Sequence, residues 1–262
     1  MLGKVSRCVI CSLSPRSAMR QERVRQLAKR LGNESVYPPM YRLLDKLPLC
    51  VACMEAKLPF QVGPQCLVCG RVMMNTPDER CTDCQRYADG HLLQNRSMMA
   101  YQEWGKEVIR QLKYRGDEHL SAMLATLLAI GYYRYYSHIP FRIVTNVPLH
   151  PSRLRERGFD QAALLAKHFA ESVNLSYFPL LRRVKNTDKL SKQAGRFARY
   201  QSMHNAFAPC EEWASRTWKA APHILIIDDI YTTGSTLRAC ASAIHSLPSL
   251  SQASIRSLTL FR

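Results

Sequence analysis

The second half of the chain alternates between short apolar runs and longer runs with helical spacing. Residues 141–147, 224–227 and 255–261 are rich in apolar and β-branched residues, which is typical of strands. The run 224–227 is apolar throughout, as expected of a strand buried on both faces. Residues 158–172 and 235–246 each follow a strand and have helical spacing. This alternation predicts an α/β domain with a largely parallel sheet.

Helical spacing also occurs before this domain core. Residues 101–136 are predicted to be helical and to pack on the sheet. Their longest apolar run is interrupted by Gly131 and Arg134, and no apolar run in the chain reaches the roughly 18 residues that a membrane helix needs.

A basic helix that ends at Gly32 is predicted near the N-terminus. Its apolar stripe consists of Val24, Leu27, Ala28 and Leu31. The cations around the stripe form either a solvated face or a face that binds polyanions. These cations are Arg16, Arg20, Arg23, Arg25, Lys29 and Arg30.

Composition and charge narrow the class of protein. The chain has 262 residues, 47% hydrophobic and 22% charged, so it can bury a sizeable core and is not disordered as a whole. This length suits one large domain or two small ones. The net charge of +17 favours nucleic acid, an anionic membrane surface or a phosphorylated ligand, or simply keeps the protein soluble. The N-terminus lacks the apolar stretch of a signal peptide, so we expect a cytoplasmic protein.

Cysteines concentrate in the first third of the chain, where eight of the ten form four Cys-x-x-Cys pairs. A two-residue spacer lets both sulfurs of a pair face one ion, so four pairs match two tetrahedral zinc sites. Disulfides would need an oxidising compartment, and a redox pair of this kind normally occurs once, so zinc is favoured. The predicted ligands are Cys8, Cys11, Cys50, Cys53, Cys66, Cys69, Cys81 and Cys84.

The separation between pairs suggests how they share the ions. The last two pairs are eleven residues apart, which suits one short ribbon. The first two pairs would then share the other ion across a long insertion that holds the basic helix. Spacing alone leaves an interleaved arrangement or one empty site open. Cys210 and Cys240 are isolated and are expected to be small buried residues.

The strongest motif spans residues 224–236. An apolar strand leads to Asp228 and Asp229, and a short polar loop then leads into a helix. Backbone N–H groups of such a loop can hold a phosphate, and Gly234 permits close approach of the backbone. Two adjacent acids can accept hydrogen bonds from ribose hydroxyls, directly or through Mg²⁺, at the sheet edge where ligands of open α/β sheets bind. The candidate phosphate-binding residues are Thr232, Thr233, Gly234, Ser235 and Thr236.

A second candidate anion site follows the strand at 141–147. Arg153, Arg155 and Arg157 lie within five residues and are predicted to form a cation-rich loop. Arginine can grip a phosphate through two parallel N–H donors, so the loop is predicted to bind pyrophosphate or a phosphate backbone. The alternative is a solvated basic turn.

Residues 224–236 resemble the phosphoribosyl-pyrophosphate motif of type I phosphoribosyltransferases. Nearly the whole chain is similar to the competence protein F (ComF) family, through the four cysteine pairs, residues 94–97, residues 110–117 and the Arg-Gly-Phe-x-Gln stretch at 157–161. The resemblance implies that Asp228 and Asp229 orient the ribose with Mg²⁺ and favour positive charge at its C1. It also implies that the arginine loop binds pyrophosphate.

The resemblance further implies an architecture, a role and partners. Residues 1–92 would form a double zinc-ribbon module, and residues 93–262 a type I phosphoribosyltransferase-like parallel sheet with helices on both faces. Family members are cytosolic and act where single-stranded DNA enters through the inner membrane during natural transformation. They are linked to a DEAD-type ATPase translocase and to the DNA-processing protein that loads recombinase. Peripheral association with the inner membrane is therefore also expected.

The chain departs from the family pattern in two places. Asp160 stands where the family usually has Asn, and it either adds an acid near the anion site or caps the following helix. A glutamine of the family pattern is displaced, with Gln193 as the candidate. Arg196 and Arg199 remain as basic residues of a flexible hood, and residues 185–199 are expected to form a mobile lid or a DNA-contacting loop.

Three functions compete on these residues. They are a DNA-uptake factor that binds phosphoribosyl pyrophosphate, an active phosphoribosyltransferase with an unknown nitrogen acceptor, and a regulator that senses the metabolite. Net charge and the whole-chain resemblance favour the first. The tyrosines at 132–136 can stack on bases, but helix packing is the favoured interpretation. The candidate DNA contacts are Lys113, Arg115, Arg196 and Arg199.

Overall fold

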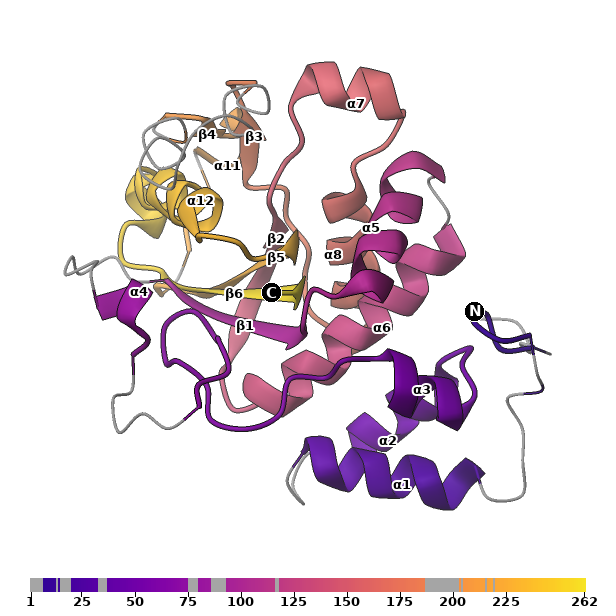
Figure 1. Cartoon of the computed structure of the whole chain (residues 1–262). Coiled ribbons are helices and arrows are strands. Elements are labelled where there is room, and N and C mark those ends of the chain that lie inside the picture. Colours follow the sequence, from indigo (N-terminus) through magenta and orange to yellow (C-terminus); the bar gives the residue numbers. More distant parts are fainter. Residues whose placement is uncertain are drawn as a thin grey trace.

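The computed structural model describes residues 7–12, 14, 20–32, 37–74, 80–85, 93–115, 118–186, 203, 205–214, 216–218 and 220–262. Its centre is a four-stranded sheet with the strand order β1–β6–β5–β2 (Figure 1). The strands are β1 (Gln94–Met99), β2 (Phe141–Asn146), β5 (His223–Ile230) and β6 (Ser254–Phe261). Every neighbouring pair is parallel, which confirms the predicted α/β fold.

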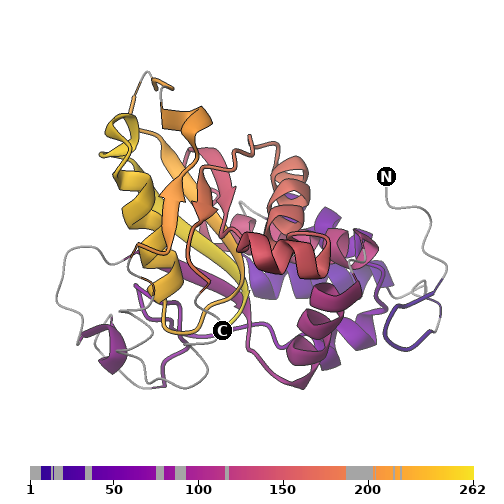
Figure 2. The ribbon, with the colours of Figure 1, turned by 90° about the horizontal axis from the view of Figure 1, so that it is seen from above.

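Helices cover both faces of this sheet, as predicted. Helix α6 (Glu118–Tyr135) packs on β1 and β6, and α8 (Gln161–Val173) packs on β2 and β5. Helix α12 (Ser235–His245) lies on the opposite face, which Figure 2 shows from above. The predicted helical region 101–136 is two helices, because α5 (Glu103–Arg115) ends before α6 begins. Residues 116 and 117, between the two helices, lie outside the described residues.

The apolar run in β5 is buried on both faces of the sheet. Leu225 and Ile227 lie in the core with α6 and α8, whereas Ile224 and Ile226 lie in the core with α12. All four side chains are fully buried. Alternate residues of a strand point to opposite faces, so a strand between two helical layers must be apolar at every position.

Helix α6 is enclosed by the rest of the fold, with α2 and α8 beside it and the sheet against it. A Cβ added at Gly131 would be in ordinary van der Waals contact with Leu258 Cδ1 and Met98 Sδ, each 3.4 Å away, so this side of α6 faces β6 and β1. Burial by these neighbours explains why α6 is apolar around most of its surface. None of the described helices combines the length and hydropathy that crossing a membrane requires.

A two-stranded antiparallel sheet lies beside α12. Its strands, β3 (Leu181–Arg183) and β4 (Phe207–Pro209), both pack against that helix. The short helix α11 (Glu211–Ala214) follows β4, and the turn at Pro248–Leu250 follows α12. The sequence did not predict this small sheet, because three-residue strands are too short to show a period of two.

Three N-terminal helices share a hydrophobic core with α6. They are α1 (Arg20–Leu31), α2 (Tyr37–Lys46) and α3 (Val51–Lys57). Helix α2 packs on α6, and α1 packs on α2 (Figure 1). The predicted apolar stripe of α1 is buried, which confirms the basic helix. The division of the chain between residues 92 and 93 stays a prediction.

Arg20 does not belong to the surface cations among which it was predicted. Its side chain is 8% exposed. Its guanidinium donates to the carbonyl oxygens of Asp45, Leu47 and Leu49 at 3.1, 3.3 and 2.5 Å. The end of a helix leaves carbonyl groups without helical partners, and a buried cation satisfies them. Arg16 lies outside the described residues, and the cations near the end of α1 are exposed.

Candidate metal centres and ligand site

The eight paired cysteines form two clusters. One contains Cys8, Cys11, Cys50 and Cys53, and the other contains Cys66, Cys69, Cys81 and Cys84. Within each cluster the four sulfur atoms all lie within 4.8 Å of one another. Sulfurs around a tetrahedral zinc ion are about 3.8 Å apart, given Zn–S bonds of about 2.3 Å. Both clusters fit such an ion, and the predicted sharing of pairs is confirmed over an interleaved one.

The first cluster closes the helical insertion. Cys50 is the N-cap of α3, and its sulfur accepts a hydrogen bond from the Cys53 N–H at 3.4 Å. Burial alone would raise the pKa of the Cys8 thiol, but backbone hydrogen bonds from Cys50, Cys11 and Ile10 lower it to about 6. Burial and the neighbouring thiols raise the pKa of Cys53. One thiol therefore ionises readily, and a cation would relieve the repulsion that opposes ionisation of the next.

The second cluster is built onto the edge strand β1. The Asn95 N–H donates to the Val68 carbonyl at 2.7 Å, and the Arg96 guanidinium donates to the Leu67 carbonyl at 3.0 Å. Gly70 has a φ of +70°, and a Cβ there would lie 2.9 Å from the Asn95 carbonyl oxygen. Only glycine tolerates both this conformation and so close an approach of the strand. All four cysteines of this cluster are buried.

A buried polar ladder joins β1 to β6 beside this cluster. The Ser257 hydroxyl donates to Asn95 Oδ1 at 2.9 Å, and the Asn95 amide donates to the Ser97 hydroxyl at 3.0 Å. The Ser97 and Thr259 hydroxyls lie 2.7 Å apart. All four residues are fully buried. Sequence reasoning missed this ladder, because only the register of the two strands brings these isolated polar residues together.

The acid pair lies inside the carboxyl end of β5. Asp229 is 7% exposed, and its Oδ2 forms an ion pair with Lys113 Nζ of α5 at 3.0 Å. The Asp229 N–H donates to Asp228 Oδ1 at 2.9 Å. Burial and the charge of Asp229 raise the pKa of Asp228 well above its usual value, although Lys113 opposes this. Lys113, predicted as a DNA contact, is thus held against the acid pair.

The loop after β5 leads directly into α12. Gly234 has a φ of +76° and is the N-cap of α12, with no side-chain hydrogen bond at the cap. The Thr233 and Ser235 hydroxyls lie 2.9 Å apart, and the Arg238 guanidinium donates to the Thr233 carbonyl at 3.1 Å. First-turn N–H groups of a helix without such a cap can bind an anion. The predicted phosphate-binding residues lie together here, namely Thr232, Thr233, Gly234, Ser235 and Thr236.

The arginine segment after β2 is a helix, α7 (Pro151–Arg157), so the predicted loop is wrong. The His150 side chain accepts a hydrogen bond at the N-cap, and Pro151 suits the first helical turn. Gly158 ends the helix with a φ of +79°. These end signals specify a seven-residue helix that is too short to show helical periodicity.

The helix separates the three arginines. Arg153 and Arg157 are one turn apart on one side, whereas Arg155 points elsewhere and is exposed. The Arg157 guanidinium donates to Gln161 Oε1 at 3.1 Å. Burial and the charge of Arg157 lower the pKa of Lys113, but the acid pair raises it by more. The charge of Arg157 is therefore felt at Lys113.

Asp160 caps the following helix, which is one of the two roles that were open for it. It is the N-cap of α8, where Oδ1 accepts the Ala163 N–H at 3.0 Å and Oδ2 accepts the Leu149 N–H at 2.9 Å. Burial raises the pKa of Asp160 despite these hydrogen bonds, and the charge of Asp229 adds to the rise. The residue caps a helix and also lies within electrostatic reach of the acid pair.

The tyrosine run packs inside the molecule, as favoured. Tyr132 and Tyr136 are buried, and their rings lie 6.3 and 5.8 Å from the ring of Phe141. Cys240 is buried as predicted, and Cys210 is half-buried. The other predicted contacts lie outside the described part of the chain, namely the Arg115 side chain, Gln193, Arg196 and Arg199.

Comparison with known proteins gives two related sequences. No family model matches the chain. The chain is 32% identical to the competence protein ComFC of Bacillus subtilis over 219 residues, which cover 82% of this chain and 84% of that protein. It is 27% identical to the competence protein ComFC of Streptococcus pneumoniae over 172 residues, or 64% of this chain and 70% of that protein. A solved structure of the allosteric regulatory enzyme of purine biosynthesis is 16% identical to this chain, with a TM-score of 0.30. The match covers 53% of this chain and 24% of the chain of that enzyme.

Proposed function

The chain belongs to the ComFC family of competence proteins, and from this premise we propose that it handles incoming single-stranded DNA in the cytoplasm during natural transformation. We also propose that its phosphoribosyltransferase-like α/β domain binds phosphoribosyl pyrophosphate with Mg²⁺. The observation that carries this second part is the acid pair at the end of β5, followed at once by a loop of hydroxyl residues in which Gly234 is the N-cap of α12.

The residues at this edge match the parts of that ligand. Asp228 and Asp229 would accept hydrogen bonds from the ribose hydroxyls, and the first turn of α12 would bind the 5′-phosphate. Lys113 pairs with Asp229, and Lys113 and Arg157 of α7 would face the pyrophosphate. Carboxylate oxygens are the ligands that Mg²⁺ prefers, and a divalent cation would relieve the repulsion that raises the pKa of Asp228.

The two cysteine clusters would each hold one zinc ion. Four thiolates with two-residue spacers, and with sulfurs within 4.8 Å of one another, form the donor set of structural zinc sites. Metal binding would release protons from the remaining thiols and add to the stability of the fold. Zinc in the second cluster would also hold the turn at Gly70 against β1.

The proposed role in DNA handling rests on family membership and charge. A net charge of +17 favours binding to a phosphate backbone through release of counterions. The exposed cations of α1 provide one such surface. The proposed partners are single-stranded DNA, the DEAD-type ATPase translocase of the uptake machinery and the DNA-processing protein that loads recombinase. The chain would meet them at the inner face of the cell membrane.

Binding of labelled single-stranded DNA to the zinc-loaded full chain tests this proposal. We expect the affinity to fall about tenfold or more between low and physiological salt. Phosphoribosyl pyrophosphate with Mg²⁺ should change that affinity. Asp228→Asn combined with Asp229→Asn should remove the effect of the ligand while DNA binding itself persists.

Two results would contradict the proposal separately. Absent or salt-insensitive DNA binding would overturn the role in DNA handling. Ligand binding that is unchanged by the double substitution would move the ligand away from the acid pair.

A second candidate function is transfer of the phosphoribosyl group, and the ion pair between Lys113 and Asp229 favours it, because it holds a cation at the acid pair. The lone pair of a nitrogen on the acceptor would form a bond to C1 of the ribose as the C1–O bond breaks. Pyrophosphate would leave with the electron pair of the broken C1–O bond. The nitrogen would then lose a proton to solvent. The acid pair would stabilise the positive charge that develops at C1, and Lys113 and Arg157 would stabilise the leaving pyrophosphate. Pyrophosphate release that requires a nitrogen compound, and that Asp228→Asn abolishes, would support this function.

A further inference from the structure

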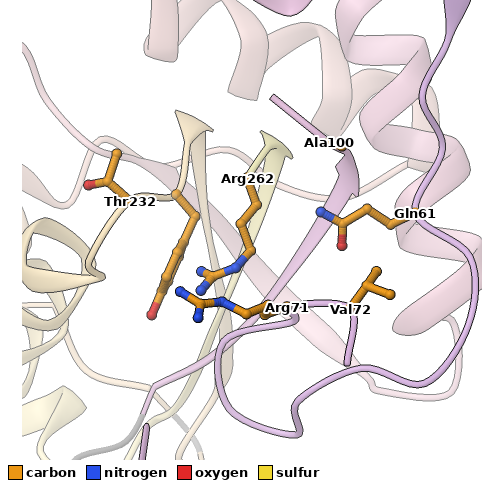
Figure 3. Close-up of a pocket in the computed structure, with 7 residues that line it drawn as sticks. Gln61, Arg71, Val72, Ala100, Thr232 and Arg262 are labelled. Atoms are coloured by element: carbon orange, nitrogen blue, oxygen red, sulfur yellow. The ribbon is translucent and has the colours of Figure 1, made fainter. Parts of the chain in front are cut away.

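A pocket of about 380 Å³ opens between the sheet and the second cysteine cluster (Figure 3). Ala100, Arg262 and Thr232 line one side of it. Ala100 and Arg262 directly follow β1 and β6, and Thr232 is the second residue after β5. Gln61 and Arg71 from the cysteine-rich segment line the other side. The volume falls in the range of roughly 300–1,000 Å³ that is typical of small-molecule sites. Three carboxyl ends of parallel strands therefore meet a wall from a separate part of the chain.

Two buried polar atoms at this pocket have no hydrogen-bond partner among the described residues. Gln61 is 6% exposed, and its amide nitrogen donates to the Met99 carbonyl at 3.4 Å while its Oε1 has no donor. Arg262 Nη1 likewise has no acceptor. An unpaired buried polar atom costs about 1–3 kcal/mol, so the pair of atoms calls for a ligand that supplies one donor and one acceptor.

The charges at the pocket specify the acceptor further. The guanidinium groups of Arg71 and Arg262 both point into it, as does the Gln61 amide (Figure 3). Arg71 is held by an ion pair with Asp83 at 2.7 Å, and Arg262 stacks on the Tyr231 ring at 4.6 Å from its centroid. None of the described lining residues is acidic. Two positioned guanidinium groups favour an oxyanion, which arginine binds through parallel N–H donors.

We propose that this pocket binds a small molecule that carries an oxyanion and an N–H group. The oxyanion would accept hydrogen bonds from Arg71 and Arg262, and the N–H would donate to Gln61 Oε1. Carboxylates and phosphates share this chemistry. The site differs from that of phosphoribosyl pyrophosphate because one of its walls is the cysteine-rich segment, and it does not require that ligand to be bound.

Tyr231 connects the pocket to the phosphate loop. One ring face is against Arg262, and its hydroxyl end is so close to Gly234 that a Cβ there would lie 2.3 Å from the Tyr231 oxygen. A ligand that moves the Arg262 guanidinium would disturb this stack and hence the loop. The pocket can therefore link the metal-binding knuckle to the loop that precedes α12.

Calorimetric titration of the zinc-loaded full chain tests the pocket with three probes: inorganic phosphate, L-glutamate and adenosine 5′-monophosphate. We expect one of the two N–H-bearing probes to bind more tightly than inorganic phosphate. Arg262→Gln should weaken that probe by about tenfold or more. Gln61→Met should weaken the same probe and leave inorganic phosphate unchanged. Arg142→Gln, which removes an exposed arginine from β2, is the matched control and should change nothing.

The outcomes distinguish the source of the oxyanion and the two proposals. Preference for glutamate indicates a carboxylate ligand, and preference for the nucleotide indicates a phosphate ligand. Asp228→Asn with Asp229→Asn should lose phosphoribosyl pyrophosphate but keep the probe. If Arg262→Gln does not fold, Arg262→Lys keeps the charge and loses the paired donors. Probe binding that survives the Arg262 and Gln61 substitutions, or no saturable binding of either N–H-bearing probe at millimolar concentration, would overturn the proposal.

Discussion

The two cysteine clusters share one ligand chemistry but are held by the fold in different ways. The second cluster is buried at all four cysteines and is hydrogen-bonded to β1. In the first cluster Cys11 is exposed and Cys50 is half-buried, and the cluster closes a helical insertion that packs on α6. Cysteine spacing predicted both sites equally well. Cysteine spacing therefore predicts where a metal could bind, whereas burial of the cysteines and their contacts with the sheet decide how much of the fold depends on that metal.

The largest expected effect comes from removing one ligand of each cluster in turn. Cys84→Ser should abolish cooperative folding or destabilise the chain by at least about 3 kcal/mol, because binding of structural zinc contributes about 10–16 kcal/mol to folding in small sites. Cys11→Ser should lower the zinc content by one ion per chain and leave the main thermal transition of the α/β domain in place. Metal analysis with calorimetry measures both. Equal losses of stability would mean that both clusters are equally integral to the fold.

The helices α1–α3, which the first cluster closes, should depend strongly on the buried Arg20. Arg20→Leu leaves the carbonyls of Asp45, Leu47 and Leu49 without their donor, and we expect a loss of about 3 kcal/mol. Because Leu49 directly precedes a ligand of the first cluster, a chelator should also remove one zinc ion faster. Arg30→Leu, at an exposed site on the same helix, is the control and should be near neutral. Equal effects in urea unfolding would contradict the buried role of Arg20.

The second cluster should depend on the close approach of its turn at Gly70 to β1. Gly70→Ala should destabilise by about 1–3 kcal/mol, through its positive φ and through a contact of 2.9 Å with the Asn95 carbonyl oxygen. Gly63→Ala is a matched control, since its φ is +100° but a Cβ there would meet only Val72 Cγ1 at 3.9 Å. With a φ of +100°, Gly63→Ala bears at least as much backbone strain as Gly70→Ala but lacks the contact, so a larger loss at Gly70 in denaturant unfolding would be due to the contact. A loss at Gly70 below about 1 kcal/mol would show that this turn can move away from the sheet.

The features that the sequence predicted correctly depend on local pattern. The buried strand at 224–227, each Cys-x-x-Cys pair and the loop around Gly234 occupy a short stretch whose composition fixes its geometry. The features that it missed depend on contacts between distant segments. Arg20 looks like its exposed neighbours until the end of α2 meets it, and Lys113 looks like a surface cation until α5 brings it to Asp229.

The candidate site divides in the same way. The acid pair and the phosphate loop are contiguous in sequence and were predicted together, whereas α7 is specified by its end signals and not by periodicity. The pocket between the sheet and the cysteine-rich segment joins Gln61 and Arg71 to Arg262, which no local pattern connects. A cation's environment is set by tertiary structure, so sequence reasoning identifies basic residues more readily than their partners.

The smallest effect is expected from two surface ion pairs, one near each cluster. Arg71 pairs with Asp83 beside the second cluster, and Arg23 of α1 pairs with Glu55 of α3 near the first cluster. Their side chains are 43% and 22% exposed in the first case and 42% and 35% in the second. Exposed pairs contribute about 0–1 kcal/mol, so double-mutant cycles with alanine should give small couplings, slightly larger for the less exposed Asp83.

High salt should shrink both couplings further, because screening acts on exposed charges. Urea unfolding of the single and double variants at two salt concentrations measures this. A coupling above about 2 kcal/mol for Arg71 and Asp83 would exceed what an exposed pair supplies. The second cluster would then be held to the fold by charge as well as by its backbone hydrogen bonds to β1. In that case its greater importance to the fold would depend on ionic strength, and the contrast between the two clusters would fade in high salt.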